Sequence, residues 1–175
     1  MKTFFDLAQT RRSTRKFKAE AVPQDIQEKL QEIVLMSPAS KRSNPWEFIF
    51  VENKETLAAI SESKQMGAAL IKDAPLAIVV LADTEKSDVW IEDASIATIY
   101  LQLAAEDLGL GSCWVQMHKR TKANGESASE VLKKLLEIPA KYEVLSVVAM
   151  GYKDEEKKPF DVTRLQKEKI HKERF

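Results

Sequence analysis

The sequence predicts an α+β fold in which helices cover both faces of a central sheet. The run from Ala74 to Ala82 is continuously apolar and has the length of a strand, a pattern typical of a strand buried on both faces. The segment from Trp90 to Leu108 repeats small and apolar residues at helical spacing. With 175 residues, 44% of them hydrophobic, the chain is long enough for one compact domain, and we expect a single domain over residues 1–175.

Capping residues and helical periodicity locate the predicted helices. Thr3 and Asp6 form the pattern of a capping box, which predicts a short helix that ends at or just before Arg11. Ser127 and Glu130 repeat this pattern and predict another helix that continues to Leu136. Apolar periodicity predicts further helices at residues 23–36, 54–63 and 90–108. Gly109 follows the longest of these as a left-handed C-cap.

Aromatic and β-branched residues identify the strands. They predict strands at residues 46–51, 74–82, 112–117 and 143–151. A polar loop at residues 37–44 precedes the first strand, and a loop between two ordered elements is a natural place for a ligand. Beyond Tyr152 the chain becomes charged and loses its apolar period, so residues 153–175 cannot form a core of their own. This tail is expected to dock, to be disordered or to wrap around a partner subunit.

Composition excludes several classes of protein. The chain has 27 Lys+Arg and 27 Asp+Glu residues and a pI near 6.8, which argues against a dedicated nucleic-acid-binding protein. Its single cysteine, Cys113, excludes an internal disulfide framework and a multi-cysteine metal site. The chain has no apolar run of about 18 residues and no signal-peptide core, so we expect a cytoplasmic protein with no membrane partner.

A local excess of positive charge stands out against this balance. Five of the eight residues from Arg11 to Lys18 are basic. Guanidinium groups interrupted by the hydroxyls of Ser13 and Thr14 offer fork-shaped donors that suit a phosphate monoester. The alternative interpretation is a solvated run of charges.

Other catalytic groups are scarce. The five glycines form neither a dinucleotide-binding fingerprint nor a phosphate-binding loop. His118 could polarise a substrate, but a lone histidine is also common at a surface or in packing. Cys113 lies in an apolar stretch and is interpreted as a buried, inert thiol. With no carboxylate dyad and no metal site, the pattern is typical of a chain whose chemistry is supplied by a bound cofactor.

Four segments in the same order resemble the FMN-dependent nitroreductase family over nearly the whole chain. They are Arg-Arg-Ser-Thr-Arg at 11–15, Ser-Pro-Ala-Ser-Lys-Arg-Ser-Asn-Pro-Trp at 37–46, Gly-Leu-Gly-Ser-Cys-Trp-Val at 109–115, and Gly151-Tyr152 followed by two lysines and Pro159. The resemblance implies a three-layer architecture with a central, mixed but mainly antiparallel sheet flanked by helices. It also implies a homodimer with FMN at the interface and a C-terminal tail, residues 153–175, around the partner.

The resemblance also implies which residues bind FMN. Those matching the phosphate and ribityl site are Arg11, Arg12, Ser13, Arg15, Gly151, Lys157 and Lys158. The loop that reaches the flavin from the second subunit contributes Pro38, Ala39, Ser40 and Asn44. The residues near the isoalloxazine ring are Trp114, Val115, Gln116 and Met117. Lys153 departs from the family pattern because it replaces the proline that usually follows the glycine and tyrosine.

The function implied is that of an FMN-dependent NAD(P)H oxidoreductase of nitroreductase type. NADH or NADPH would give hydride to flavin N5, and nitroaromatic, quinone or similar acceptors would then receive it in a ping-pong cycle. Two alternatives remain open: a flavin-binding module without turnover, and a family member with a specialised reductive reaction such as dehalogenation. A nucleic-acid-binding domain with an arginine-rich segment is a further alternative, which the balanced charge disfavours.

Overall fold

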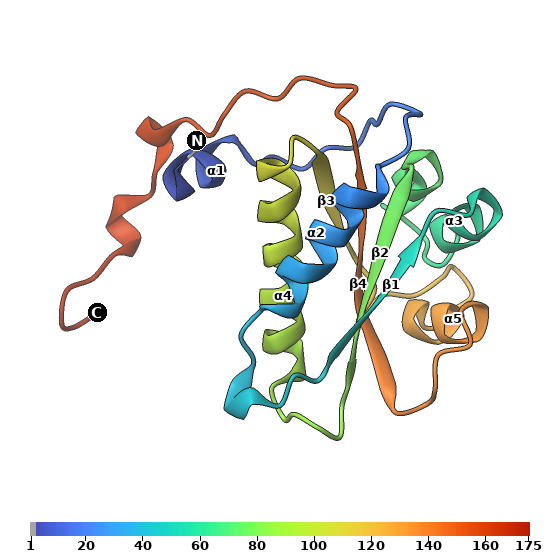
Figure 1. Ribbon diagram of the computed structural model, residues 1–175. Helices are drawn as coiled ribbons and strands as arrows, with labels where there is room; N and C mark the ends of the chain where they lie inside the picture. The colour runs from blue at the N-terminus through green and yellow to red at the C-terminus, as the bar shows by residue number, and fades with distance from the viewer. Residues whose placement is uncertain (1–2) are drawn as a thin grey trace.

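The computed structural model describes residues 3–175 and contains a four-stranded sheet with helices on both faces (Figure 1). Met1 and Lys2, which open the predicted domain, lie outside the described residues. The strands are β1 (Trp46–Val51), β2 (Leu76–Asp83), β3 (Gly111–Gln116) and β4 (Tyr142–Gly151). Their order is β1-β2-β4-β3, and all three pairings between them are antiparallel. The α+β prediction with a mainly antiparallel sheet is confirmed.

Within residues 3–175, five α-helices surround this sheet. They are α1 (Phe4–Thr10), α2 (Gln24–Leu35), α3 (Lys54–Ser61), α4 (Trp90–Asp107) and α5 (Ala128–Leu135). Figure 1 shows α2 and α4 on one face, and α3 and α5 on the other. None of the helices within residues 3–175 is long and apolar enough to span a membrane.

Strand β2 divides the core into two apolar clusters, and all of its residues are buried. Its side chains alternate between the faces, as the two-residue period of a strand requires. Val79 belongs to the cluster under α3 and α5, together with Leu132. Ile78 and Val80 belong to the cluster under α4. The apolar run in the sequence therefore marks the central strand, as predicted.

The helix ends follow the predicted capping residues with one exception. The Thr3 side chain accepts a hydrogen bond from the Asp6 N–H, and the Asp6 carboxylate accepts one from the Thr3 N–H. Ser127 begins α5, but its side chain makes no capping hydrogen bond with any residue of 3–175. Glu130 accepts instead from Lys133 Nζ at 2.8 Å. The second capping box is therefore wrong, although the helix is present, because a lysine one turn later competes for the carboxylate.

The tail leaves the sheet after β4, crosses near α1 and continues beyond it (Figure 1). The Phe160 N–H donates to the Gln9 carbonyl at 2.8 Å. Apolar side chains of the tail remain exposed, among them Leu165 at 50% and Ile170 at 76%. As predicted, this segment forms no core of its own.

Candidate functional site

The basic run is held along β3 rather than left in solvent. The Thr14 N–H donates to the Ser112 carbonyl at 2.9 Å, and Ser13 forms a parallel bridge with Ser112. The Thr14 side chain is buried against Gly111, where an added Cβ would lie 2.5 Å from Thr14 Oγ1. A glycine is needed at this position because the β3 backbone and the segment that contains Thr14 approach each other closely. The run is therefore a fixed part of the structure.

Neighbouring residues of this extended segment point to different sides. The Ser13 hydroxyl and the Arg15 guanidinium both lie near the Cys113 thiol. Arg11, two residues before Ser13, shares their side in an extended chain. Arg12 differs, because its Nη1 donates to the Lys158 carbonyl at 2.6 Å. The structure thus separates Arg12 from the other predicted phosphate ligands.

Arg12 lines a cavity of about 620 Å³ between the basic run and the start of the tail. Lys153 also lines it, and its Nζ lies 2.6 Å from Glu106 Oε2. The cavity therefore contains a lysine already paired with a buried carboxylate. The lining also includes Glu155 and Lys157, which connect this cavity to Arg15.

Glu155 ties the tail to the basic run. Its Oε1 accepts from the Arg15 N–H at 2.6 Å, and its Oε2 lies 2.9 Å from Lys157 Nζ. These two contacts hold the pKa of the Glu155 carboxyl below its ordinary value, and the hydrogen bond from the Arg15 N–H has the larger effect. Lys157 is thereby held beside the run, whereas Lys158 contributes its main-chain carbonyl and has an exposed side chain.

Gly151 ends β4 at this same edge of the sheet. It pairs with Gly111 of β3, and an added Cβ would lie 2.6 Å from the Pro75 ring. The glycine predicted from the motif is therefore required for packing. It brings the segment that follows it, including Glu155 and Lys157, next to the basic run.

Lys64 is a residue that the sequence analysis missed. Its Nζ donates to the Gln116 carbonyl at 2.9 Å, and its charge acts on both Cys113 and Arg120. Burial, with a further contribution from Arg120, lowers the pKa of the Lys64 ammonium. No local pattern signals this residue, since it lies in an irregular segment after α3 and only the fold brings it to β3.

The Cys113 thiol is buried and has a raised pKa. The cause is burial, which outweighs the opposing effects of Arg15 and Ser13. A thiol that remains protonated is a poor nucleophile, so the structure agrees with the interpretation of Cys113 as inert.

The end of β3 positions the residues predicted near a flavin ring. Trp114 Nε1 donates to Gln116 Oε1 at 2.8 Å, and the Val115 side chain is buried in the core. The Met117 N–H and the His118 N–H both donate to the Leu145 carbonyl. The Met117 main-chain donor is therefore already used within the fold.

The His118 ring packs edge-on against Trp90, with the ring centres 5.0 Å apart. Burial, with a smaller contribution from Lys119, lowers the pKa of His118. A neutral ring packed against an aromatic side chain fits the packing interpretation of this histidine.

The predicted flavin loop lies at the other end of α4. The Ser40 N–H donates at 2.7 Å to Asp93 in the first turn of this helix, whereas Glu106 in its last turn contacts Lys153. These helix positions are 13 residues apart, which corresponds to roughly 20 Å along an α-helix. Within one chain, the structure therefore does not bring the loop to the basic run (Figure 1). The predicted loop residues are Pro38, Ala39, Ser40 and Asn44.

The loop has features typical of a binding segment. Lys41, Arg42 and Asn44 all have positive φ, a strained conformation for these side chains. Ser37 Oγ and Trp46 Nε1 are buried and have no hydrogen-bond partner among the described residues. Such polar atoms normally find a partner, which is often an ordered water.

Four cations in the segments around β3 lack an ion-pair partner among residues 3–175. Arg11, Arg15, Lys64 and Arg120 form no ion pair with any residue in the described part of the chain. We call Arg11, Arg15 and Lys64 the basic rim. Cations that lack ion-pair partners favour the binding of an anion.

Comparison with known proteins gives a consistent result. The family model described as "Nitroreductase family" matches residues 8–69 and 61–152. A protein of Archaeoglobus fulgidus with the provisional name NADH dehydrogenase/NAD(P)H nitroreductase is 34% identical over 171 residues, covering 95% of each chain. The solved structure of an FMN-dependent nitroreductase from Clostridium difficile has a TM-score of 0.96 and 42% identity, and the match covers 98% of this chain and 100% of that one. An iodotyrosine deiodinase of Thermotoga neapolitana is 24% identical over 186 residues, covering 90% of this chain and 92% of its own.

Proposed function

This chain belongs to the nitroreductase family, and from this membership we propose that it is an FMN-dependent NAD(P)H oxidoreductase. NADH or NADPH would be the electron donor, and nitroaromatics, quinones or similar compounds the acceptors, in a ping-pong cycle. The observation on which the proposal rests is the basic rim, a set of cations whose side chains form no ion pair with any residue of 3–175. The names of the relatives agree with this proposal.

The residues present suit FMN. Arg11, Arg15 and the Ser13 hydroxyl would hold the phosphate and ribityl chain, since charge-assisted hydrogen bonds are worth about 1.5–3 kcal/mol each. Of the two tail lysines, Lys157 is the better candidate for the phosphate, because Glu155 already holds its Nζ beside Arg15. Arg12 would support the site indirectly, through its bond to the Lys158 carbonyl.

The chain would contribute charge and position to the reaction. When bound, FMN would supply the two-electron chemistry that the side chains lack. Lys64 is anchored to the Gln116 carbonyl and would place a positive charge at the ring end of the site. This charge would favour the reduced, more negative cofactor over the oxidised one. The absence of any inserted helix over this edge within residues 3–175 favours an open site for acceptors.

The active form would be a homodimer. The loop at residues 37–44 lies too far from the basic run of its own chain, so a second copy would bring the two together. The exposed face of α4 carries Ile96, Ile99 and Tyr100, each about one third exposed, and offers an apolar surface for this contact. The tail, residues 153–175, would wrap around the partner, and this contact would bury the apolar side chains of the tail.

The decisive experiment is anaerobic titration of the FMN-loaded protein with NADH and with NADPH. Bleaching of the flavin absorbance bands, followed by recovery on addition of a nitroaromatic or a quinone, is expected. A protein that cannot take up FMN would overturn the proposal. Binding without bleaching would favour a flavin-binding module without turnover.

A screen of acceptors would address the specialised alternative. An iodotyrosine belongs in the screen because one relative carries the name iodotyrosine deiodinase. Preferred turnover of the iodinated substrate would favour reductive dehalogenation over nitroreduction. Light scattering on the same preparation should give the mass of a dimer. The flavin absorbance should correspond to one FMN per chain.

A further inference from the structure

We infer that a cationic pocket beside the basic rim is a subsite for the phosphate or carboxylate group of the electron donor or acceptor. The pocket has a volume of about 390 Å³. It is lined by Lys64, Gln65, Met66, Lys119, Arg120 and Thr121. We call it the cationic pocket. The inference rests on the proposed function, because it concerns the molecules that exchange electrons with the flavin.

The charge of this pocket is unbalanced. Lys64, Lys119 and Arg120 contribute three cations, and no carboxylate is among the lining residues. A second cavity of about 540 Å³ elsewhere on the molecule shows the opposite arrangement. There Lys54 and Lys72 line the same space as Glu52 and Asp73. The imbalance is therefore particular to the cationic pocket, and an anion from outside the chain would remove it.

Backbone hydrogen bonds fix the segments from which these side chains extend. The Gln65 N–H donates to the Thr121 carbonyl at 3.1 Å, which joins the two segments that form the pocket walls. The Arg120 N–H donates to the Met117 carbonyl at 3.0 Å, and Lys119 between them has a φ of 55°. A tight turn with a residue in the left-handed region is thus used to present Lys119 and Arg120. A preformed arrangement reduces the entropy cost of binding a ligand.

Lys64 connects this pocket to the proposed flavin site. Its Nζ donates to the Gln116 carbonyl, which leaves further protons on the ammonium to donate elsewhere. Burial and the nearby Arg120 make its charge costly, as the lowered pKa shows. An anion bound here would offset that cost. It would also hold the remainder of its molecule close to the ring end of the flavin site, where orientation assists electron transfer.

Met66 adds an apolar surface to the rim of the pocket, since its side chain is 80% exposed. An exposed methionine next to cations suits a ligand with a flat apolar body and a charged end. Both a nicotinamide dinucleotide and an aromatic carboxylate have this character.

The test compares anionic and neutral forms of the same compound. Isothermal titration calorimetry on the FMN-loaded protein, without reductant, would measure binding of 4-nitrobenzoate and of the neutral 4-nitrobenzamide. In the double variant Lys119→Gln/Arg120→Gln, affinity for 4-nitrobenzoate should fall about fivefold to tenfold, as expected for the loss of partly exposed charge pairs. Affinity for 4-nitrobenzamide should change less than about twofold on the same basis. The charge-matched control is the double variant Lys54→Gln/Lys72→Gln in the other cavity, which should alter neither value.

Steady-state kinetics separates the two sources of the anion. A rise in KM for NADPH but not for NADH would assign the pocket to the 2′-phosphate of the donor. A rise in KM for 4-nitrobenzoate alone would assign it to a carboxylate on the acceptor. Both effects should shrink at high ionic strength.

Three outcomes would overturn the inference. The first is unchanged affinity and KM for every anionic compound in the double variant. The second is an equal loss for 4-nitrobenzamide, which would indicate general disruption of the site. The third is loss of FMN itself, which would place Arg120 in the flavin site. Failure of the proposed function would be recognised separately, since a wild-type protein that is not bleached by nicotinamides can still be titrated with 4-nitrobenzoate.

Discussion

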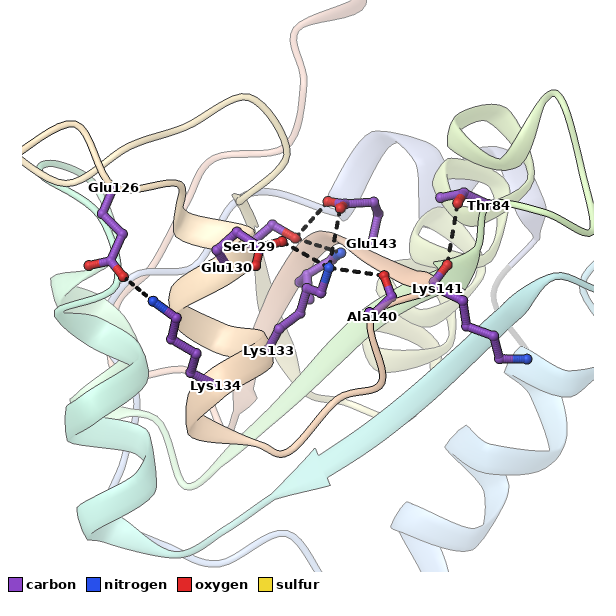
Figure 2. A network of polar contacts seen from close by, with 10 residues as sticks. Thr84, Glu126, Ser129, Glu130, Lys133, Lys134, Ala140, Lys141 and Glu143 are labelled. Carbon is purple, nitrogen blue, oxygen red and sulfur yellow. Dashed lines mark hydrogen bonds and ion pairs between the residues drawn. The ribbon is translucent and has the colours of Figure 1, made fainter.

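Two regions of the molecule use the same side chains for different purposes. Both lysines of α5 have carboxylate partners (Figure 2). Lys133 Nζ lies 2.8 Å from Glu130 Oε1 and 3.5 Å from Glu143 Oε1. Lys134 Nζ lies 2.9 Å from Glu126 Oε1. Along β3, the basic rim has no such partners among the described residues. The α5 network joins elements of the fold, whereas the rim leaves charge available.

The pKa shifts have opposite signs in the two regions. Hydrogen bonds to Glu130 and Glu126 raise the pKa values of Lys133 and Lys134. Burial and Arg120 lower the pKa of Lys64. A raised lysine pKa shows that the fold stabilises the charge, and a lowered one shows that the fold tolerates it at a cost. Charges tolerated at a cost are frequent at binding sites.

The largest expected effect is loss of FMN from variants of the rim. Arg11→Ala or Arg15→Ala should weaken FMN retention by about tenfold to a hundredfold, because each removes charge-assisted hydrogen bonds to the phosphate. Retention is measured from the flavin absorbance that remains after gel filtration. Arg120→Ala should lose far less FMN. Equal FMN retention by all three variants would refute the assignment of the phosphate site.

The second prediction concerns Gly111, where the basic run meets the sheet. Gly111→Ala would force a Cβ to within 2.5 Å of the buried Thr14 side chain, so either β3 or the run must shift. Overpacking of this kind costs about 1–3 kcal/mol in the free energy of unfolding. Urea denaturation and FMN titration should show stability and affinity falling together, unlike the arginine variants.

A double variant provides the control for that position. Thr14→Ala removes Oγ1 and Cγ2, two of the three atoms that the new Cβ would meet. Combined with Gly111→Ala, it should recover part of the stability that the single variant loses. Strictly additive losses would mean that the close contact between Gly111 and Thr14 is not the cause.

The predictions that succeeded from sequence depend on local signals. The capping box of Thr3, the left-handed Gly109 at φ 80° and the apolar run of β2 all follow from short-range preferences, and the structure confirms them. The capping box of Ser127 failed because Lys133 competes for Glu130, a contact that the four-residue pattern does not include.

The candidate functional site was harder to predict from the sequence than the fold, because some of its contacts are not local. Lys64 reaches the β3 edge only through tertiary packing, whereas Arg120 lies in the turn that directly follows β3, and neither lies in a recognisable motif. The resemblance implies a role for the loop containing Ser40, but a single chain leaves that loop roughly 20 Å from the basic run, measured along α4. Residues that meet only across an interface leave no spacing signal within the sequence.

The third prediction removes the centre of the α5 network. Lys133→Ala should lower the free energy of unfolding by about 1–2 kcal/mol, because Glu130, Glu143 and the Ala140 carbonyl all lose a donor. FMN retention should stay as in the wild type. Lys134→Ala, which breaks only a surface pair, should have a smaller effect on the urea midpoint. A loss of FMN in Lys133→Ala without loss of stability would break the distinction between the two regions.

The smallest effect is expected at Lys141, whose Nζ lies 2.7 Å from Asp83 Oδ2 at the end of β2. This hydrogen bond is the main cause that holds the pKa of the Asp83 carboxyl below its ordinary value, which is about 3.9. A carboxyl with a depressed pKa in the folded state contributes stability above the unfolded pKa, and this contribution is lost as the pH falls through the folded value.

Lys141→Ala should therefore lower the urea midpoint near pH 7, and its difference from the wild type should shrink below about pH 4. Lys86→Ala is the matched control, because the charge of the exposed Lys86 is the smallest of the causes that lower the pKa of Asp83, and its main-chain bond to Asp83 is kept in the variant. Its effect should have the same direction and be smaller. FMN retention should be unchanged in both variants, since neither lysine belongs to the basic rim. A difference in midpoint that persists undiminished at pH 3 would mean that Lys141 stabilises the fold through packing of its side chain rather than through the Asp83 charge.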